Sequence, residues 1–244
     1  MKENKIWNDY LPEDMQEHWT VYECLKESED SSTFLVKETA TGILCVLKWG
    51  RNRQAGVLRN EKEIMKKMAD RKLSGIPKAY RIFEENGEVY LVREYIEGMS
   101  LAQMVLQKGG ISEAEICRIS RKICQTAEQF QNPDEPMIHR DIKPENIVVT
   151  PGGEVVFIDF GTMRSYKKDG SRDTFVVGTR GTAAPEQYGY TQTDQRTDVY
   201  AIGQTMLYMV SESYEMNQLS ECAVSRRMKK IIEKACSFEP DKRY

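Results

Sequence analysis

The chain has 244 residues, of which 40% are hydrophobic and 30% charged, a composition typical of a globular protein of one large domain or two lobes. Its formal net charge of -3 does not favour nucleic acid as a partner, and no apolar run approaches the roughly 20 residues that span a bilayer. The start lacks the apolar core of a signal peptide, and the six cysteines form no CxxC pair, so we expect reduced thiols in a cytoplasmic protein.

Strands dominate the prediction for the first hundred residues. Short segments rich in β-branched and aromatic residues alternate there with polar or glycine-containing turns. The segments that we expect to be strands are 19–25, 32–40, 42–49 and 89–96.

One helix, predicted over 58–70, interrupts these strands. Ile64, Met65 and Met68 recur at helical spacing, and Glu61 lies on the same stripe, whereas Glu63 falls among charged residues. We therefore expect Glu61 to point inward. Lys48 ends the strand before this helix, and a lysine held by a glutamate is a rigid cation for phosphate oxygens.

Helices dominate the prediction after residue 100. Ser112 and Glu115 have the spacing of a capping box at the start of a helix over 111–130, and 198–210 is apolar on nearly every side, as in a buried helix. Residues 146–160 predict a hairpin around Pro-Gly-Gly, and 224–238 predict an amphipathic helix. The pattern indicates an α+β fold with a small β-rich lobe followed by a larger α-helical lobe.

The polar stretch "HRDIKPEN" (139–146) precedes the predicted hairpin, and burying so many polar groups without partners would cost several kcal/mol. A tight hairpin would bring Asn146 beside Asp159 at its other end. Two oxygen ligands there suit Mg²⁺, which keeps water and phosphates as its other ligands. Asp141 would then face the group that reacts with those phosphates, and Lys143 could neutralise charge on the transferred group. With only two histidines in the chain, a histidine-built metal site is not expected.

Six motifs in order resemble the protein kinase family. They are "CVLK" (45–48), "HRDIKPEN" (139–146), "DFG" (159–161), "APE" (184–186), "DVYAIG" (198–203) and "PDKR" (240–243). The resemblance runs from about Val21 to the last residue. It implies a single bilobal kinase domain over 1–244, with an N-lobe of about 20–95, a hinge of about 94–99 and a C-lobe of about 100–244. It also implies that a further helix follows in a longer natural protein, and that Arg243 pairs with Glu186.

The resemblance implies ATP and Mg²⁺ as co-substrate and cofactor, and it assigns the catalytic roles. Asp141 would orient the substrate hydroxyl and accept its proton, and Lys143 would steady the γ-phosphate. Asp159 and Asn146 would each hold a Mg²⁺. Lys48, held by Glu61, would hold the α- and β-phosphates.

Further nucleotide contacts follow from the same resemblance. The adenine would bind the hinge backbone at Glu94 and Ile96. The remaining residues that we expect to contact the nucleotide are Val46, Val148, Ser28 and Ser31.

Lys143 in "DIKPEN" and Thr179 in "GTRGTAAPE" resemble the Ser/Thr-specific branch, most closely the bacterial enzymes, so a protein with an accessible Ser or Thr is the expected substrate. Thr179 would contact Asp141 and Lys143. Thr174 is the best candidate for activating phosphorylation, and Arg140 would receive its phosphate through bidentate hydrogen bonds.

Three departures from the family pattern concern the nucleotide. Lys26, Ser28 and Ser31 occupy the places of the three glycines that cover the phosphates, and Thr33 replaces a valine. Arg93 occupies the gatekeeper position, where it would either reach solvent or place a cation near Glu61 and Asp159.

Two other functions remain open. Because the phosphate-covering loop lacks glycines, the chain could instead be a pseudokinase or a nucleotide-sensing scaffold with weak or no phosphate-transfer activity. A small-molecule kinase of the aminoglycoside type is less favoured, because that group lacks an activation segment closing in "APE".

Overall fold

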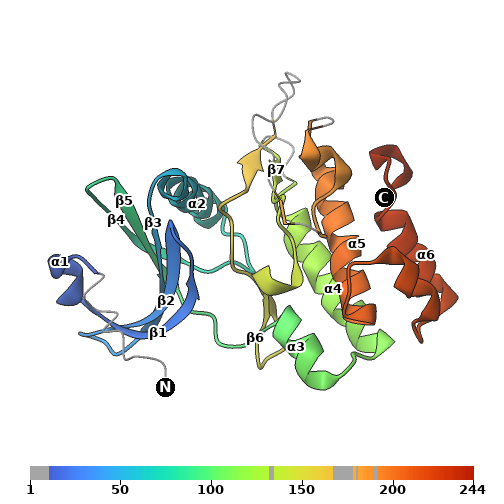
Figure 1. Cartoon of the computed structure of the whole chain (residues 1–244), viewed down its shortest axis with the longest axis horizontal. Coiled ribbons are helices and arrows are strands. Elements are labelled where there is room, and N and C mark those ends of the chain that lie inside the picture. Colours follow the sequence, from blue (N-terminus) through green and yellow to red (C-terminus); the bar gives the residue numbers. More distant parts are fainter. Residues whose placement is uncertain (1–10, 132–134, 167–177, 180, 190–191) are drawn as a thin grey trace. The chain divides into compact units, whose positions relative to one another are not determined.

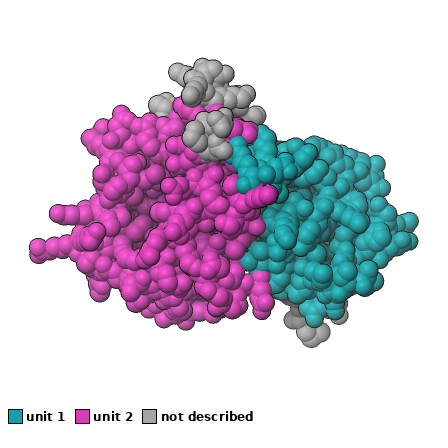
Figure 2. Space-filling model, turned by 180° about the vertical axis from the view of Figure 1, so that it is seen from behind, with its two compact units in different colours: residues 1–71, 77–96 teal, residues 72–76, 97–244 magenta. Residues whose placement is uncertain are grey.

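The computed structural model describes residues 11–131, 135–166, 178–179, 181–189 and 192–244. Two compact units are distinguished by their internal contacts and are coloured separately in Figure 2. Unit 1 comprises Met1–Arg71 and Pro77–Ile96, and unit 2 comprises Lys72–Ile76 and Glu97–Tyr244. None of the helices within the described ranges is both long and apolar enough to cross a membrane.

Unit 1 is an antiparallel sheet of five strands in the order β1-β2-β3-β5-β4, with helix α2 against it (Figure 1). The elements are α1 (Glu13–Gln16), β1 (Trp19–Glu27), β2 (Ser31–Glu38), β3 (Leu44–Gly50), α2 (Arg53–Asp70), β4 (Ala79–Glu85) and β5 (Glu88–Glu94). The predicted strands are present. Strand β4 was not predicted, because as an edge strand it buries neither face completely and its residues show no clean alternation.

The strand register separates the two faces of this sheet. Lys48 lies opposite Thr33 and Leu91. On its face of the sheet, the Lys48 side chain contacts Glu61 of α2. The opposite face packs its own apolar cluster, in which Met15 of α1 and Trp19 are almost completely buried. Residues N-terminal to the sheet therefore form part of the core of unit 1.

Helix α2 confirms the predicted stripe but begins at Arg53, five residues earlier than expected. Glu61, Ile64, Met65 and Met68 are buried, whereas Glu63 is exposed. The start was missed because no side chain caps the helix.

Unit 2 is mainly helical, with α5 in contact with both α4 and α6 (Figure 1). Its helices are α3 (Leu101–Lys108), α4 (Glu113–Glu128), α5 (Gln195–Ser211) and α6 (Arg226–Ala235), with 3₁₀ helices at Pro144–Asn146, Pro185–Tyr188, Met216–Glu221 and Pro240–Lys242. Its strands are β6 (Met99–Ser100), β7 (Met137–Ile138), β8 (Ile147–Val149), β9 (Val155–Phe157) and β10 (Arg164–Ser165), paired as β6-β8-β9 and β10-β7. The predicted sequence of a β-rich region and then a helical region is confirmed.

The start of α4 corrects one expectation. Ser112 Oγ accepts a hydrogen bond from the Glu115 backbone N–H at 3.3 Å, as predicted, but the Glu115 carboxylate pairs with Lys108 Nζ at 2.9 Å. The capping box is therefore only half formed, because an available cation competes for the carboxylate. Glu113 instead accepts two hydrogen bonds from Ser225 and so joins the beginnings of α4 and α6.

We expect Met15→Ala to lower the free energy of unfolding of unit 1 by about 2–5 kcal/mol, because the methionine is fully buried and leaves a cavity. Leu25→Ala is the matched control, since Leu25 is 47% exposed on β1, and it should change stability little. Denaturant titration followed by tryptophan fluorescence measures this unit, because the three tryptophans, at positions 7, 19 and 49, all precede residue 72. Equal losses in both variants would contradict the role of α1 in the core.

Candidate active site

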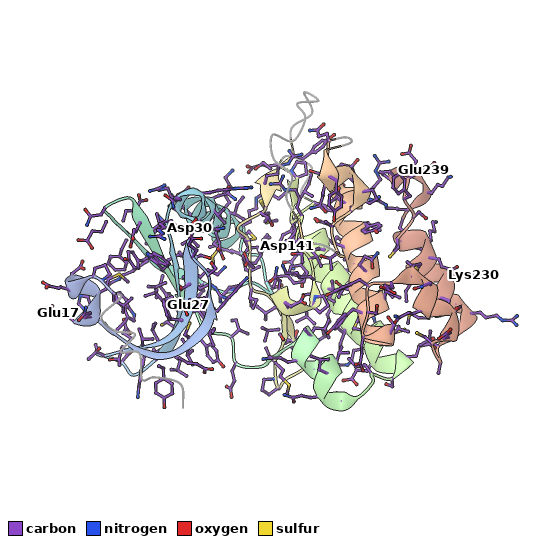
Figure 3. The ribbon with its side chains drawn as sticks, in the orientation of Figure 1. Glu17, Glu27, Asp30, Asp141, Lys230 and Glu239 are labelled. Atoms are coloured by element: carbon purple, nitrogen blue, oxygen red, sulfur yellow. The ribbon has the colours of Figure 1, made fainter. Side chains whose placement is uncertain are left out.

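The carboxylate of Asp141, which Figure 3 labels, is the centre of a hydrogen-bonded group in unit 2. Its Oδ2 accepts from Lys143 Nζ at 2.8 Å and from Asn146 Nδ2 at 2.9 Å. Its Oδ1 accepts from Thr179 Oγ1 at 2.8 Å, and Lys143 Nζ also lies 2.5 Å from that hydroxyl. Four side chains that are separated by up to 38 positions in the sequence thus converge, and the orientation of the carboxylate is fixed from three sides.

The backbone before Asp141 is fixed by a buried carboxylate from α5. Asp198 accepts hydrogen bonds at 2.9 Å from the backbone N–H groups of both His139 and Arg140. Arg140 has φ of 66°, a left-handed conformation that costs a non-glycine residue free energy. Burial raises the pKa of Asp198 to about 6, although the two backbone hydrogen bonds oppose this rise.

His139 is an aromatic part of the core rather than a charged group. It is 1% exposed, and its ring contacts those of Phe130, Phe157 and Phe160. Burial lowers its pKa to about 4, although the nearby carboxylate of Asp141 acts in the opposite direction and raises the pKa. The ring is therefore neutral at pH 7. Its Nδ1 accepts a hydrogen bond from the Asp141 backbone N–H at 3.4 Å.

Asn146 and Asp159 lie at the two open ends of the β8–β9 hairpin, as the sequence predicts. The Ile158 backbone N–H donates to the Asn146 carbonyl oxygen at 2.9 Å. Asn146 Nδ2 donates to the Asp141 side chain and, at 3.0 Å, to its carbonyl oxygen, which orients the amide and leaves its Oδ1 without a hydrogen bond to any described residue. Asp159 Oδ1 accepts from the Gly161 N–H at 3.1 Å.

These two side chains offer oxygen ligands of the kind that Mg²⁺ prefers. In the described ranges no group of three or more His, Cys, Asp or Glu residues could hold a metal ion. A Mg²⁺ at this hairpin would therefore take its other ligands from water or from phosphate oxygens.

Lys48 and Glu61 form a buried ion pair in unit 1. Lys48 Nζ lies 2.8 Å and 2.9 Å from the two carboxylate oxygens of Glu61, which is 1% exposed. The pair joins β3 to the inward face of α2. Val46, two residues earlier, is buried on the same face of the sheet, opposite Arg93.

The turn between β1 and β2 is closed by side chains in the absence of glycine. The Ser28 backbone N–H and its Oγ donate to the Ser31 carbonyl oxygen at 2.8 Å and 2.9 Å, and the two serine hydroxyls lie 2.8 Å apart. Asp30 Oδ1 accepts from Arg51 Nε at 2.9 Å and from Asn52 Nδ2 at 3.0 Å. The turn is thereby attached to the start of α2. Sequence reasoning missed this attachment, because its partners are about 20 positions apart.

Arg93 does not reach solvent, so that alternative is wrong. The residue is 4% exposed, and its Nη1 donates to the Glu94 carbonyl oxygen at 3.0 Å. The Glu94 backbone N–H donates to the Lys78 carbonyl oxygen at 2.8 Å, and Ile96 is half-buried. Val148 is buried in β8 of unit 2. Adenine binding by these residues stays a prediction.

The sequence resemblance assigns a regulatory role to Arg140 and Thr174. Arg140 Nε donates to the Thr162 carbonyl oxygen at 2.8 Å. Thr174 lies outside the described residues.

Glu186 and Arg243 form a buried ion pair, as the sequence resemblance implies. Arg243 Nη1 and Nη2 lie 2.7 Å and 2.9 Å from the two carboxylate oxygens, and Thr197 Oγ1 donates to the first oxygen at 2.8 Å. Burial opposes ionisation of Glu186, but the hydrogen bonds from Arg243 and Thr197 outweigh it and hold the pKa of the carboxyl below its ordinary value.

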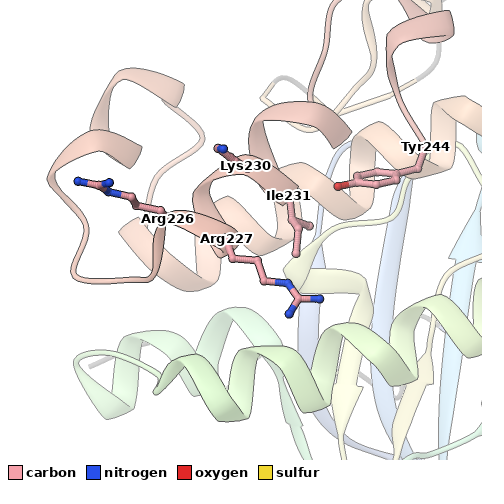
Figure 4. A pocket seen from close by; sticks show the side chains of 5 residues that line it. All are labelled: Arg226, Arg227, Lys230, Ile231 and Tyr244. Atoms are coloured by element: carbon pink, nitrogen blue, oxygen red, sulfur yellow. The ribbon is translucent and has the colours of Figure 1, made fainter.

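A large cavity in unit 2, of about 780 Å³, is lined by none of the site residues described above. It is lined by Arg226, Arg227, Lys230, Ile231 and Tyr244, from α6 and the last residue (Figure 4). Figure 4 shows that the two arginine side chains diverge from the start of α6. They do not converge on one position, so we assign no ligand to this cavity.

We expect Arg243→Met to lower the free energy of unfolding of unit 2 by about 3–5 kcal/mol, because it leaves Glu186 buried without its cation. The double variant with Glu186→Gln should recover part of that loss. Lys242→Met is the control: it removes an exposed ion pair with Glu239 and should cost less than about 1 kcal/mol. Urea unfolding followed by far-UV circular dichroism measures the helices. If Arg243→Met is as stable as Lys242→Met, the pair does not stabilise the unit.

The sequence is similar to a known family model and to known proteins. The family model described as "Protein kinase domain" matches residues 20–244. The chain is 32% identical over 190 residues to serine/threonine-protein kinase D of Synechocystis, covering 70% of this chain and 36% of that protein. It is 35% identical over 147 residues to a probable serine/threonine-protein kinase of Clostridium perfringens, covering 60% of this chain and 21% of the relative. The chain thus spans about a third or less of the length of such relatives.

Proposed function

The chain belongs to the protein kinase family, and we propose that it transfers the γ-phosphate of Mg-ATP to Ser or Thr hydroxyl groups of protein substrates. The observation that carries this proposal is the convergence of Lys143, Asn146 and Thr179 on the carboxylate of Asp141. Relatives that are named serine/threonine-protein kinases support the same class of reaction.

Asp141 serves as the proton acceptor in the proposed reaction. The substrate hydroxyl oxygen attacks the γ-phosphorus, its proton passes to a carboxylate oxygen of Asp141, and the bond from the γ-phosphorus to the ADP oxygen breaks. The Oδ1 atom already accepts from a threonine hydroxyl, that of Thr179, so its environment suits an alcohol donor. Lys143 provides positive charge next to the transferred group.

The other assignments concern ATP and its metal. Asn146 and Asp159 would hold Mg²⁺, which when bound supplies positive charge to the phosphate oxygens. Lys48, which contacts both carboxylate oxygens of Glu61, would be a fixed cation for the α- and β-phosphates. Phosphoryl transfer depends mainly on such positioning and charge stabilisation.

A pseudokinase is the second candidate, and the turn between β1 and β2 favours it. The hydroxyl groups of Ser28 and Ser31 fill a turn where glycine would let the backbone approach phosphates closely. A protein of this kind would bind the nucleotide without transferring phosphate.

We expect Asp141→Asn to reduce phosphate transfer by about 10²–10⁴-fold, because an amide does not accept the hydroxyl proton. Nucleotide affinity should change little in this variant, whereas Asp159→Ala should weaken binding of Mg-ATP. The measurements are transfer from labelled Mg-ATP to a generic protein substrate and a separate titration with nucleotide.

Glu154→Gln is the control for these variants, because Glu154 is an exposed carboxylate at the turn of the same hairpin and pairs with Lys122. It should match the wild type in both measurements. Transfer that survives undiminished in Asp141→Asn would overturn the catalytic assignment. Nucleotide binding without any transfer by the wild type would instead favour the pseudokinase.

Activation by phosphorylation at Thr174 extends this proposal. A phosphate carries about -1.5 to -2 charges at neutral pH, and the guanidinium of Arg140, next to Asp141, matches it by bidentate hydrogen bonding. We expect Thr174→Ala to lower the activity of enzyme that has been incubated with Mg-ATP, and mass spectrometry should find phosphate on Thr174 of the wild type.

Arg140→Ala should remove the difference between phosphorylated and unphosphorylated enzyme. Should Thr174→Ala work as fast as fully phosphorylated wild type, Thr174 is not the activating site, and Ser171→Ala is the next variant to measure.

A further inference from the structure

A second cavity, of about 440 Å³, lies within unit 1. Trp49 of β3 is opposite Ser32 of β2 and Tyr90 of β5, and all three line the cavity. Lys48 is the neighbour of Trp49, and successive residues of a strand point to opposite faces. The cavity therefore opens on the face of the sheet that is turned away from the Lys48–Glu61 pair, and its volume falls in the range of small-ligand sites.

Negative charge exceeds positive charge around this cavity. Glu27, Glu29 and Glu88 line it, and Arg51 is the one cation among its lining residues. The guanidinium of Arg51 already has partners: Nε donates to Asp30 at 2.9 Å, Nη2 donates to the Glu29 carbonyl oxygen at 3.1 Å, and its carbon lies 5.8 Å from the centre of the Trp49 ring. The lining residues thus carry three carboxylates and one guanidinium, a formal negative charge that favours a cation over an anion.

Glu88 has one oriented oxygen that the described residues leave open. Trp49 Nε1 and Tyr90 Oη both donate to Glu88 Oε2, each at 2.7 Å. Burial and the contact with Glu88 raise the pKa of Tyr90, so the phenol remains a neutral donor. Because both donors use Oε2, the carboxylate is fixed in orientation, and Oε1 makes no hydrogen bond with a described residue.

Ser32 provides a second, independent polar group. The residue is only 7% exposed and lines the cavity from β2. Its hydroxyl makes no hydrogen bond to any residue in the described ranges, and the oxygen is not sealed from solvent, so it is open to the cavity. A ligand in the cavity would satisfy this hydroxyl.

Aromatic side chains complete the lining. Phe34, Trp49 and Tyr90 supply ring surface beside the carboxylates. Aromatic faces attract cations, and they also pack against methylene groups. A ligand with a charged nitrogen at the end of an aliphatic chain matches both parts of the lining.

We propose that this cavity binds a primary ammonium or guanidinium group on an aliphatic chain, with the nitrogen at Glu88 Oε1 and Ser32 Oγ and the chain against the aromatic rings. Two sources share this chemistry: a free alkylamine, and the side chain of a lysine or arginine in another protein.

The probe is n-pentylammonium, titrated by calorimetry in the absence of nucleotide, so the result is independent of kinase activity. We expect saturable binding that weakens with added salt, and at least tenfold weaker binding of 1-pentanol, which has the same chain without the charge. A short peptide with one central lysine and free 1,5-diaminopentane distinguish the two sources, since the physiological form should bind more tightly than the probe.

Glu88→Gln should weaken the binding of n-pentylammonium at least tenfold, because it removes the charge yet keeps an oxygen that accepts from Trp49 and Tyr90. Ser32→Ala should weaken it less. Glu63→Gln, an exposed carboxylate on α2 outside the cavity lining, is the matched control and should bind as the wild type does. Melting temperatures of all variants verify folding.

Three results would overturn the proposal. They are the absence of saturable binding to the wild type at millimolar n-pentylammonium, equal affinity for 1-pentanol, and unchanged affinity in folded Glu88→Gln.

Discussion

The two hydrogen bonds from the backbone of His139 and Arg140 to Asp198 are the constraint on which the candidate active site depends. Arg140 adopts a left-handed conformation that a non-glycine residue avoids without compensation. A buried carboxylate from α5 supplies that compensation. The reversal at Arg140 directs the next side chain, Asp141, toward Lys143, Asn146 and Thr179. Burial disfavours the charged form of Asp198 and raises the pKa of its carboxyl, whereas the two backbone hydrogen bonds favour the charged form.

Side-chain hydrogen bonds replace backbone freedom in the turn between β1 and β2. Glycine would permit a close approach to phosphates, whereas Ser28 and Ser31 close the turn through their hydroxyls. Asp30 then attaches the turn to Arg51 and Asn52 at the start of α2. A turn held in this way loses less conformational entropy on binding than a flexible one, because it is ordered beforehand. The absence of glycines therefore does not by itself exclude a nucleotide.

The charged side chains of the two buried ion pairs are matched one to one, whereas those that line the cavity of unit 1 are mostly acidic. Lys48–Glu61 and Glu186–Arg243 are buried and fully paired, which avoids the large cost of an isolated buried charge. The cavity beside Trp49 has three carboxylates and one arginine that is already engaged. Solvent tolerates the formal negative charge of this partly exposed cavity, and Glu88 Oε1, which makes no hydrogen bond with a described residue, is available to a ligand.

The order of a β-rich and a helical region can be predicted from the sequence alone, because strand and helix periodicities are local properties. The sequence also indicates that Glu61 points inward and that the ends of the β8–β9 hairpin bring Asn146 beside Asp159, since helix and hairpin geometry follow from short-range spacing. It does not reveal strand β4, the start of α2 or the burial of Arg93. These features depend on how the elements pack, as do the contacts of Asp198 with the loop before Asp141, of Asp30 with Arg51, and of Trp49 and Tyr90 with Glu88. Most of these contacts join residues far apart in the chain, and the donor that a carboxylate finds is settled only when the strands and helices have packed.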